Sequence, residues 1–100
     1  LDIVEMHEAF AAQVLATLNA IESPEWCKEK LGLSQPLAQV DRTRLNVNGG
    51  SIPLGHPFGA TGARMVLQTL HELRNRQKNL GLISICAAGG MGVVMVVEAI

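Results

Sequence analysis

The sequence has no tyrosine and few aromatic residues, 3% of its 100 residues. It contains only two cysteines, Cys27 and Cys86, which are far apart and do not form a disulfide framework. The cysteines and histidines show no paired ligand spacing, so no zinc site is predicted. The formal net charge is −1, and no basic stripe is present. Phosphate backbones bind to such stripes, so we do not expect nucleic acid as a partner.

A transmembrane segment is not predicted, although residues 80–97 carry no charge. Gly89, Gly90 and Gly92 interrupt the middle of this segment, and both halves are rich in β-branched residues. Two short buried strands joined by a tight loop therefore fit the segment better than a membrane span. No secretory leader is predicted at the start of the chain, because acidic residues stand where a basic region would be.

Hydrophobic residues make up 48% of the sequence, which is a high fraction for 100 residues. A single domain of this size buries only a limited part of its surface. We therefore expect an apolar face that needs a cover. We interpret the chain as a fragment of a longer polypeptide, whose N-terminal half supplies that cover. An interaction domain that is recruited through the same apolar face is an alternative.

The pattern of apolar residues predicts a strand over residues 1–6 and a helix over residues 8–21. His7 then lies at a strand-to-helix junction, where ligand sites occur in open α/β sheets. The core stripe of the helix is expected to contain Phe10, Val14, Leu18 and Ile21. Residues 22–44 are rich in charges and contain prolines, so they are expected to form an exposed excursion with Cys27 as a free thiol in a loop.

A second helix is expected after residue 62, with His71 on its polar face. Its apolar stripe consists of Ala63, Val66, Leu67, Leu70 and Leu73. Strands over residues 82–86 and 92–98 are predicted to pair as antiparallel neighbours through a loop at residues 87–91. This order of elements indicates an α/β fold with a small sheet and two helices.

The segment from residue 46 to residue 62, NVNGGSIPLGHPFGATG, is the most informative part of the sequence. It places His56 between Gly55 and Pro57, shortly before the second helix. Glycines allow backbone conformations and close approaches that a side chain would block. Free N–H groups at a helix N-terminus favour negative charge, so an oxyanion fits beside this imidazole. Taken alone, a histidine in such a loop is more often structural than catalytic.

This segment resembles the thiolase signature Asn-x-x-Gly-Gly-x-Ile-x-x-Gly-His-Pro-x-Gly-x-Thr-Gly, with Pro53 at a position where the family usually has alanine or serine. Residues 7–11, HEAFA, resemble a second thiolase motif, whose first residue is commonly asparagine and is histidine in the long-chain, trifunctional-complex type. Residues 86–92, CAAGGMG, resemble the C-terminal cysteine loop. Because three motifs occur in order, the chain is similar to the C-terminal part of a 3-ketoacyl-CoA thiolase.

The resemblance implies a layered αβαβα fold, of which residues 1–100 form a portion of the C-terminal domain. It implies thiolytic cleavage of 3-ketoacyl-CoA in fatty-acid β-oxidation, with coenzyme A thioesters as substrates and neither a cofactor nor a metal. A biosynthetic acetoacetyl-CoA thiolase and a non-catalytic acyl-CoA-binding relative are the alternatives. It also suggests a homo-oligomer with a β-oxidation multienzyme partner, in the bacterial cytoplasm or the mitochondrial matrix of a eukaryote.

The same resemblance assigns the catalytic roles. His56 donates a hydrogen bond to the thioester oxygen and takes the proton of the nucleophile. His7 holds a water as the second donor. Cys86 protonates the enolate, since a thiol pKa lies close enough to neutrality to be tuned for this step. The backbone N–H of Ala88 helps to bind the second oxyanion.

Two further residues, Ala9 and Phe10, are expected to contact the substrate. The family motif places Phe10 beside the pantetheine arm of coenzyme A, whereas its helical spacing places it in the core. The cysteine that accepts the acyl group in the family belongs to the N-terminal half. Nothing in this sequence resembles its surroundings, so the chain alone is expected to be inactive.

Overall fold

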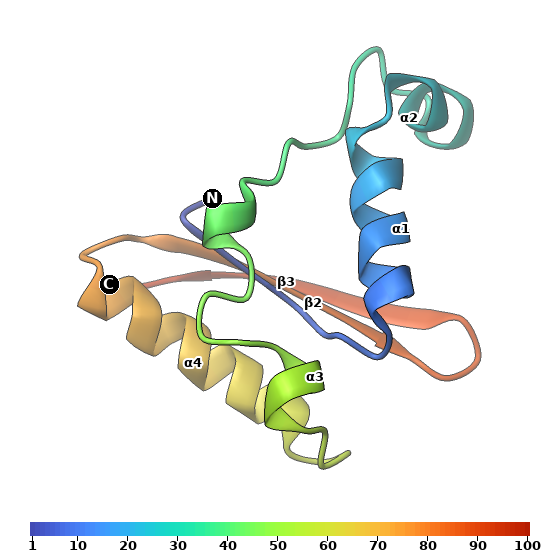
Figure 1. The fold of residues 1–100 in the computed structure, drawn as a ribbon. Coiled ribbons are helices and arrows are strands. Elements are labelled where there is room, and N and C mark those ends of the chain that lie inside the picture. Colours follow the sequence, from blue (N-terminus) through green and yellow to red (C-terminus); the bar gives the residue numbers. More distant parts are fainter.

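The sheet of this protein has three strands, in the order β1 (Ile3–Met6), β2 (Leu80–Ala87) and β3 (Met91–Glu98). A computed structural model describes all residues from 1 to 100. β1 runs parallel to β2, and β2 runs antiparallel to β3 (Figure 1). The sheet is therefore mixed, and the predicted antiparallel hairpin of the last two strands is confirmed.

Four α-helices and one 3₁₀ helix accompany the sheet, where the sequence predicted two helices. Their bounds are α1 (Ala11–Glu22), α2 (Pro24–Leu31), η1 (Arg42–Arg44), α3 (Ser51–Leu54) and α4 (Thr61–Asn75). The two long helices, α1 and α4, lie on opposite faces of the sheet (Figure 1). No helix combines the length and apolar character that crossing a membrane requires.

The core forms where α1 packs on β1. Val4 and Met6 of the strand contact Val14 and Leu18 of the helix, and Ile21 packs against this cluster. Side chains alternate between the two faces of a strand, so Ile3, which is fully buried, lies toward α4. Three of the four residues predicted for the stripe of this helix thus take part in the core.

The fourth residue, Phe10, does not belong to the core, and this prediction was wrong. Its side chain is 74% exposed, and it occupies the position before the first turn of α1. The helix begins three residues later than predicted. The reason is that the side chains of His7 and Glu8 are bound to the segment from residue 46 to residue 52, which holds this stretch out of the helix.

The apolar stripe predicted for α4 was also largely wrong. Leu67 is 59% exposed, whereas the buried face consists of Thr61, Met65, Thr69 and Leu73. The contact with β2 explains this choice, because a side chain in place of Gly81 would collide with the methyl group of Thr69. The helix comes closest to the sheet at Thr69, while Met65 and Leu73 are buried on the same face and Leu67 is left outside. His71 is exposed, as predicted.

β3 is not the buried strand that the sequence predicted. Its side chains from Val93 to Val96 are between 47% and 65% exposed. The helices α1 and α4 lie mainly over β1 and β2, so the hairpin of β2 and β3 extends beyond them (Figure 1). The apolar sequence of β3 therefore has little cover within this chain.

Residues 22–44 are not simply an exposed excursion, because they contain α2. The Oγ of Ser23 accepts a hydrogen bond from the Trp26 N–H at 3.2 Å, and Pro24 occupies the first helical position. The predicted loop position of Cys27 was wrong, since this residue lies in α2 and is fully buried. Its thiol is free, as predicted. Ser-Pro ends α1 and also starts the next helix.

Candidate active site

His7 immediately follows β1 and continues its pairing with β2. Its backbone N–H donates to the Ser84 carbonyl at 2.8 Å. The residue is only 4% exposed, and its Nδ1 lies 2.7 Å from the Oγ of Ser51, at the start of α3. The strand-to-helix junction thus fixes this imidazole in the position that the sequence predicted.

His56 lies between α3 and α4, where Gly55 adopts a φ of 96°, a value that favours glycine. Its Nδ1 lies 2.5 Å from the Oγ1 of Thr61, the first residue of α4. The rings of His56 and His7 are in contact, with centroids 4.3 Å apart and an interplanar angle of 47°. The structure therefore brings together two of the three predicted catalytic side chains.

The side chain of Asn46 joins the loop to the end of β1. Its Oδ1 accepts from the Met6 N–H at 2.8 Å, and its Nδ2 donates to the Met6 carbonyl at 2.9 Å. The backbone N–H of Asn46 also donates to the carbonyl of Val4 at 2.8 Å. One residue therefore satisfies three backbone groups on the outer edge of the strand.

Glu8 links the same loop to the histidine pair. Its carboxylate accepts from Asn46 Nδ2 at 3.1 Å and from the Ile52 N–H at 3.2 Å. The carboxylate occupies the space that a side chain of Gly50 would need. The acidic residue of the HEAFA motif and the glycine pair of the signature at residues 46–62 therefore fit together, and their contact positions Ser51 beside His7.

We expect the Gly50→Ala substitution to displace Glu8, because the new methyl group would collide with its carboxylate. Loss of the two hydrogen bonds of Glu8, together with local overpacking, should lower the free energy of unfolding by about 1–3 kcal/mol. Chemical denaturation of a full-length protein that carries these residues measures the effect. Gly59→Ala is the matched control, since the corresponding space is open there. Equal losses of stability in the two variants would contradict the prediction.

Arg64 of α4 carries positive charge into this site. Its Nη2 donates to Ser51 Oγ at 3.2 Å, and its Nη1 donates to Gln68 Oε1 at 2.9 Å. Burial lowers the pKa of His7 below its usual value, and the charges of His56 and Arg64 act in the same direction. These effects favour the neutral form of His7.

Glu5 is a buried carboxyl group on the face of β1 that lies toward α4. Only 1% of the residue is exposed, and its Oε2 has no hydrogen-bond partner. Burial raises its pKa to about 7, although the charge of Arg64 opposes this change. The pattern of residues 1–6 predicted only a strand and did not indicate a titrating group there.

Cys86 and Ala88 lie at the far end of β2 and in the hairpin turn. Cys86 is half-buried and stands two residues beyond Ser84, which pairs with the backbone of His7. Its thiol forms no hydrogen bond with either histidine. Ala88 is exposed, as are Ala9 and Phe10 beside the junction. The roles of these four residues remain predictions.

Several residues that hold the histidines were not identified as functional from the sequence. These are Glu8, Ser51, Thr61 and Arg64. Glu8 and Thr61 lie within the quoted motifs, so the motifs contained a signal for them. Ser51 occupies an unspecified position of the signature, and Arg64 follows its end. Only the three-dimensional structure shows that their side chains meet.

The fold and the site define an α/β domain in which two neighbouring imidazoles are suited to acid–base and oxyanion chemistry. Residues 1–99 match the family model described as the C-terminal domain of thiolase. The chain therefore belongs to the thiolase family.

Proteins named 3-ketoacyl-CoA thiolase are similar to almost the whole chain. The protein of Aeromonas salmonicida is 58% identical over 98 residues, which are 98% of this chain and 22% of that protein. The protein of Klebsiella pneumoniae is 57% identical over 99 residues, which are 99% of this chain and 23% of that protein. The chain spans less than a quarter of the length of these relatives.

A solved structure agrees with this assignment. The crystal structure of the Bacillus anthracis acetyl-CoA acetyltransferase matches with a TM-score of 0.74 and 40% sequence identity. The match covers 99% of this chain and 21% of that protein. The mixed sheet and its helices are thus a known part of a thiolase-type structure.

Proposed function

We propose that this chain supplies the oxyanion-binding and acid–base residues of a degradative 3-ketoacyl-CoA thiolase. The reaction cleaves a 3-ketoacyl-CoA with a second coenzyme A, giving acetyl-CoA and a shortened acyl-CoA in fatty-acid β-oxidation. The observation that carries this proposal is the contact between His7 and His56, each from a different thiolase motif. Coenzyme A thioesters are the substrates, and no further cofactor takes part.

The first step requires a thiolate that attacks the 3-keto carbon, and the rest of the polypeptide supplies this cysteine. His56 accepts the proton of the thiol. Its hydrogen-bond partners support this role, because the hydroxyl of Thr61 donates to the Pro57 carbonyl at 3.2 Å. The Oγ1 of Thr61 is then free to accept from Nδ1–H of His56, which leaves Nε2 as the proton acceptor.

Cleavage of the carbon–carbon bond releases acetyl-CoA as an enolate. Its oxygen needs preorganised donors, for which we propose His56 and a water held by His7. Its carbon needs a proton, for which we propose the thiol of Cys86. The backbone N–H of Ala88 helps to hold the second oxyanion, which forms when the acyl group passes to coenzyme A. Ala9 and Phe10 are proposed to contact the pantetheine arm.

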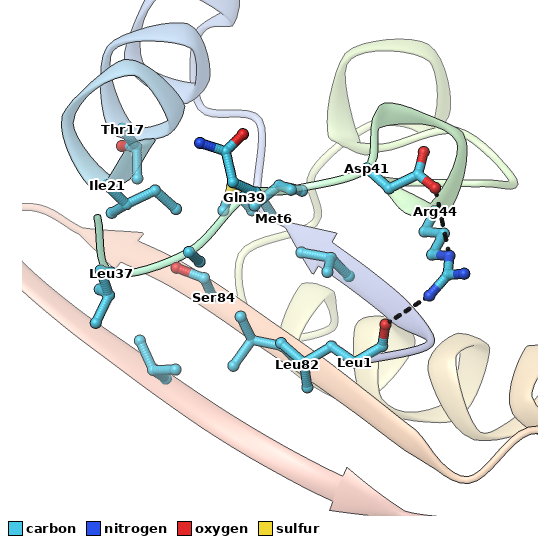
Figure 2. Close-up of a pocket in the computed structure, with 14 residues that line it drawn as sticks. Leu1, Met6, Thr17, Ile21, Leu37, Gln39, Asp41, Arg44, Leu82 and Ser84 are labelled. Atoms are coloured by element: carbon cyan, nitrogen blue, oxygen red, sulfur yellow. Dashed lines mark hydrogen bonds and ion pairs between the residues drawn. The ribbon is translucent and has the colours of Figure 1, made fainter. Parts of the chain in front are cut away.

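The uncovered apolar surface supports the view that these residues act within a polypeptide of the relatives' length. A cavity of about 580 Å³ opens between α1, the sheet and the segment around residues 37–41. Figure 2 shows Ile21 of α1 and Leu82 of β2 on its walls, with Arg44 paired to Asp41 at one end. We propose that the remaining polypeptide packs against this apolar surface. We also propose that the full protein is a homo-oligomer and binds a multienzyme partner of β-oxidation. Its location would be the cytoplasm of a bacterium or the matrix of a mitochondrion.

The proposed function is tested by an assay of a full-length thiolase that carries residues 1–100. We expect coenzyme A-dependent cleavage of both short and long 3-ketoacyl-CoAs, whereas the 100-residue chain alone should be inactive because it lacks the nucleophile. Measurement of substrate loss and of acetyl-CoA formation follows the reaction. Cleavage of acetoacetyl-CoA alone would favour the biosynthetic alternative. Binding of acyl-CoA without cleavage would favour the non-catalytic alternative.

A further inference from the structure

We propose that Ser51, supported by Arg64, positions His7 with its ring proton on Nε2, so that His7 acts as a hydrogen-bond donor in the reacting site. This inference rests on the proposed function and adds two positioning residues to it. Ser51 and His7 are both buried, with 6% and 4% of their surfaces exposed. Their hydrogen bond, between Oγ and Nδ1, is 2.7 Å long.

The direction of the hydrogen bond between Ser51 and His7 follows from the contact of Ser51 with Arg64. An arginine side chain donates hydrogen bonds and cannot accept them. Arg64 Nη2 donates to the Oγ of Ser51 at 3.2 Å, so one lone pair of this oxygen is occupied. The hydroxyl hydrogen of Ser51 then points away from the arginine and needs an acceptor of its own.

Nδ1 of His7 is the acceptor that the hydroxyl of Ser51 meets. If Nδ1 carried the proton instead, both His7 and Arg64 would donate to the same oxygen. The hydroxyl hydrogen would then be buried without a partner, which is unfavourable. The arrangement in which Ser51 donates to His7 gives the hydroxyl hydrogen a partner. In the neutral imidazole, this leaves the proton on Nε2.

The charge of the surroundings agrees with a neutral ring. Burial is the main cause that lowers the pKa of His7, the charges of His56 and Arg64 act in the same direction, and the charge of Glu8 opposes them. A doubly protonated ring could not accept from Ser51, so the serine would lose its partner. The two histidines are thereby given complementary states, with a donor at Nε2 of His7 and an acceptor at Nε2 of His56.

The test uses a full-length thiolase that carries residues 1–100. Ser51→Ala should lower kcat by about tenfold with little change in KM. This fall in kcat is smaller than the fall of about 10²–10³-fold expected when an oxyanion donor is removed outright. Ser51→Thr keeps the hydroxyl group and should retain most of the activity. Ser34→Ala, in an exposed loop, is the matched control and should leave kcat unchanged.

The tautomer is measured directly by ¹⁵N NMR of protein labelled at histidine, with the His7 signals identified by their loss in His7→Asn. We expect the proton on Nε2 in the wild type and a mixture of tautomers in Ser51→Ala. Arg64→Met provides a second variant, because Ser51 can then accept from Nδ1–H. A wild-type proton on Nδ1, or an unchanged tautomer in both variants, would overturn the inference.

The outcomes separate this inference from the proposed function. A wild-type protein without thiolase activity would refute the proposed function, and the NMR measurement would still decide the state of His7. A fully active Ser51→Ala variant with the wild-type tautomer would refute the positioning role and leave thiolase activity in place.

Discussion

Replacing His56 with alanine in a full-length thiolase that carries residues 1–100 should lower the rate of thiolysis by at least about 100-fold. The substitution removes the acceptor for the proton of the nucleophile and a donor to the thioester oxygen. The ring also packs against His7, at a centroid distance of 4.3 Å, so the neighbouring imidazole loses its support. The rate is measured as loss of the 3-ketoacyl-CoA under saturating coenzyme A.

His71→Ala is the control for this experiment. His71 is exposed on α4 and has no contact with the histidine pair, so its removal should leave the rate within about twofold of the wild type, as is usual for surface substitutions. An active His56→Ala variant would show that the nucleophile is deprotonated by another group. The acid–base role proposed for this residue would then be wrong.

The second large effect is expected for Cys86→Ser. A hydroxyl group is far too weak an acid to protonate an enolate near neutral pH, so thiolysis should fall by about 10²–10⁴-fold. Binding of the acyl-CoA should change little, because the side chains have nearly the same size. Rapid mixing with a 3-ketoacyl-CoA, followed by trapping of the acylated enzyme, should show slow formation of the acyl-enzyme.

Cys27→Ala separates this effect from the loss of any thiol. Cys27 is fully buried in α2, where its Sγ accepts from the Leu37 N–H at 3.3 Å. Its removal should reduce stability without a comparable fall in kcat. Thiolysis at the wild-type rate in Cys86→Ser would exclude this residue as the acid.

The strands, and the part of the core between α1 and β1, could be predicted from the sequence because the local pattern of apolar residues determines them. Val14 and Leu18 face the sheet at helical spacing, and the two glycines that follow Ala88 mark the turn between β2 and β3. The buried face of α4 could not be predicted in the same way. It depends on the close approach of Thr69 to Gly81, which no property of the helix sequence reveals.

The candidate site shows the same division. Composition and spacing alone favoured a structural role for His56, and the resemblance to thiolase motifs paired it with His7 in one site. The hydrogen bonds that orient the two rings were not predictable. Ser51 and Arg64 are separated from His7 by more than forty residues, and their roles depend on which way each side chain points.

Asn46 binds the outer backbone groups of β1, so the two edges of the sheet differ in their capacity to pair with another strand. Asn46 already binds the outward carbonyl of Val4 and both outward backbone groups of Met6, so another strand cannot pair with this edge at these positions. β3 offers the opposite case, because its outer edge is unpaired and its apolar side chains from Met91 to Val96 are exposed. Exposed apolar edge strands promote strand addition and aggregation. In a protein limited to residues 1–100, we therefore expect any growth of the sheet to occur at β3.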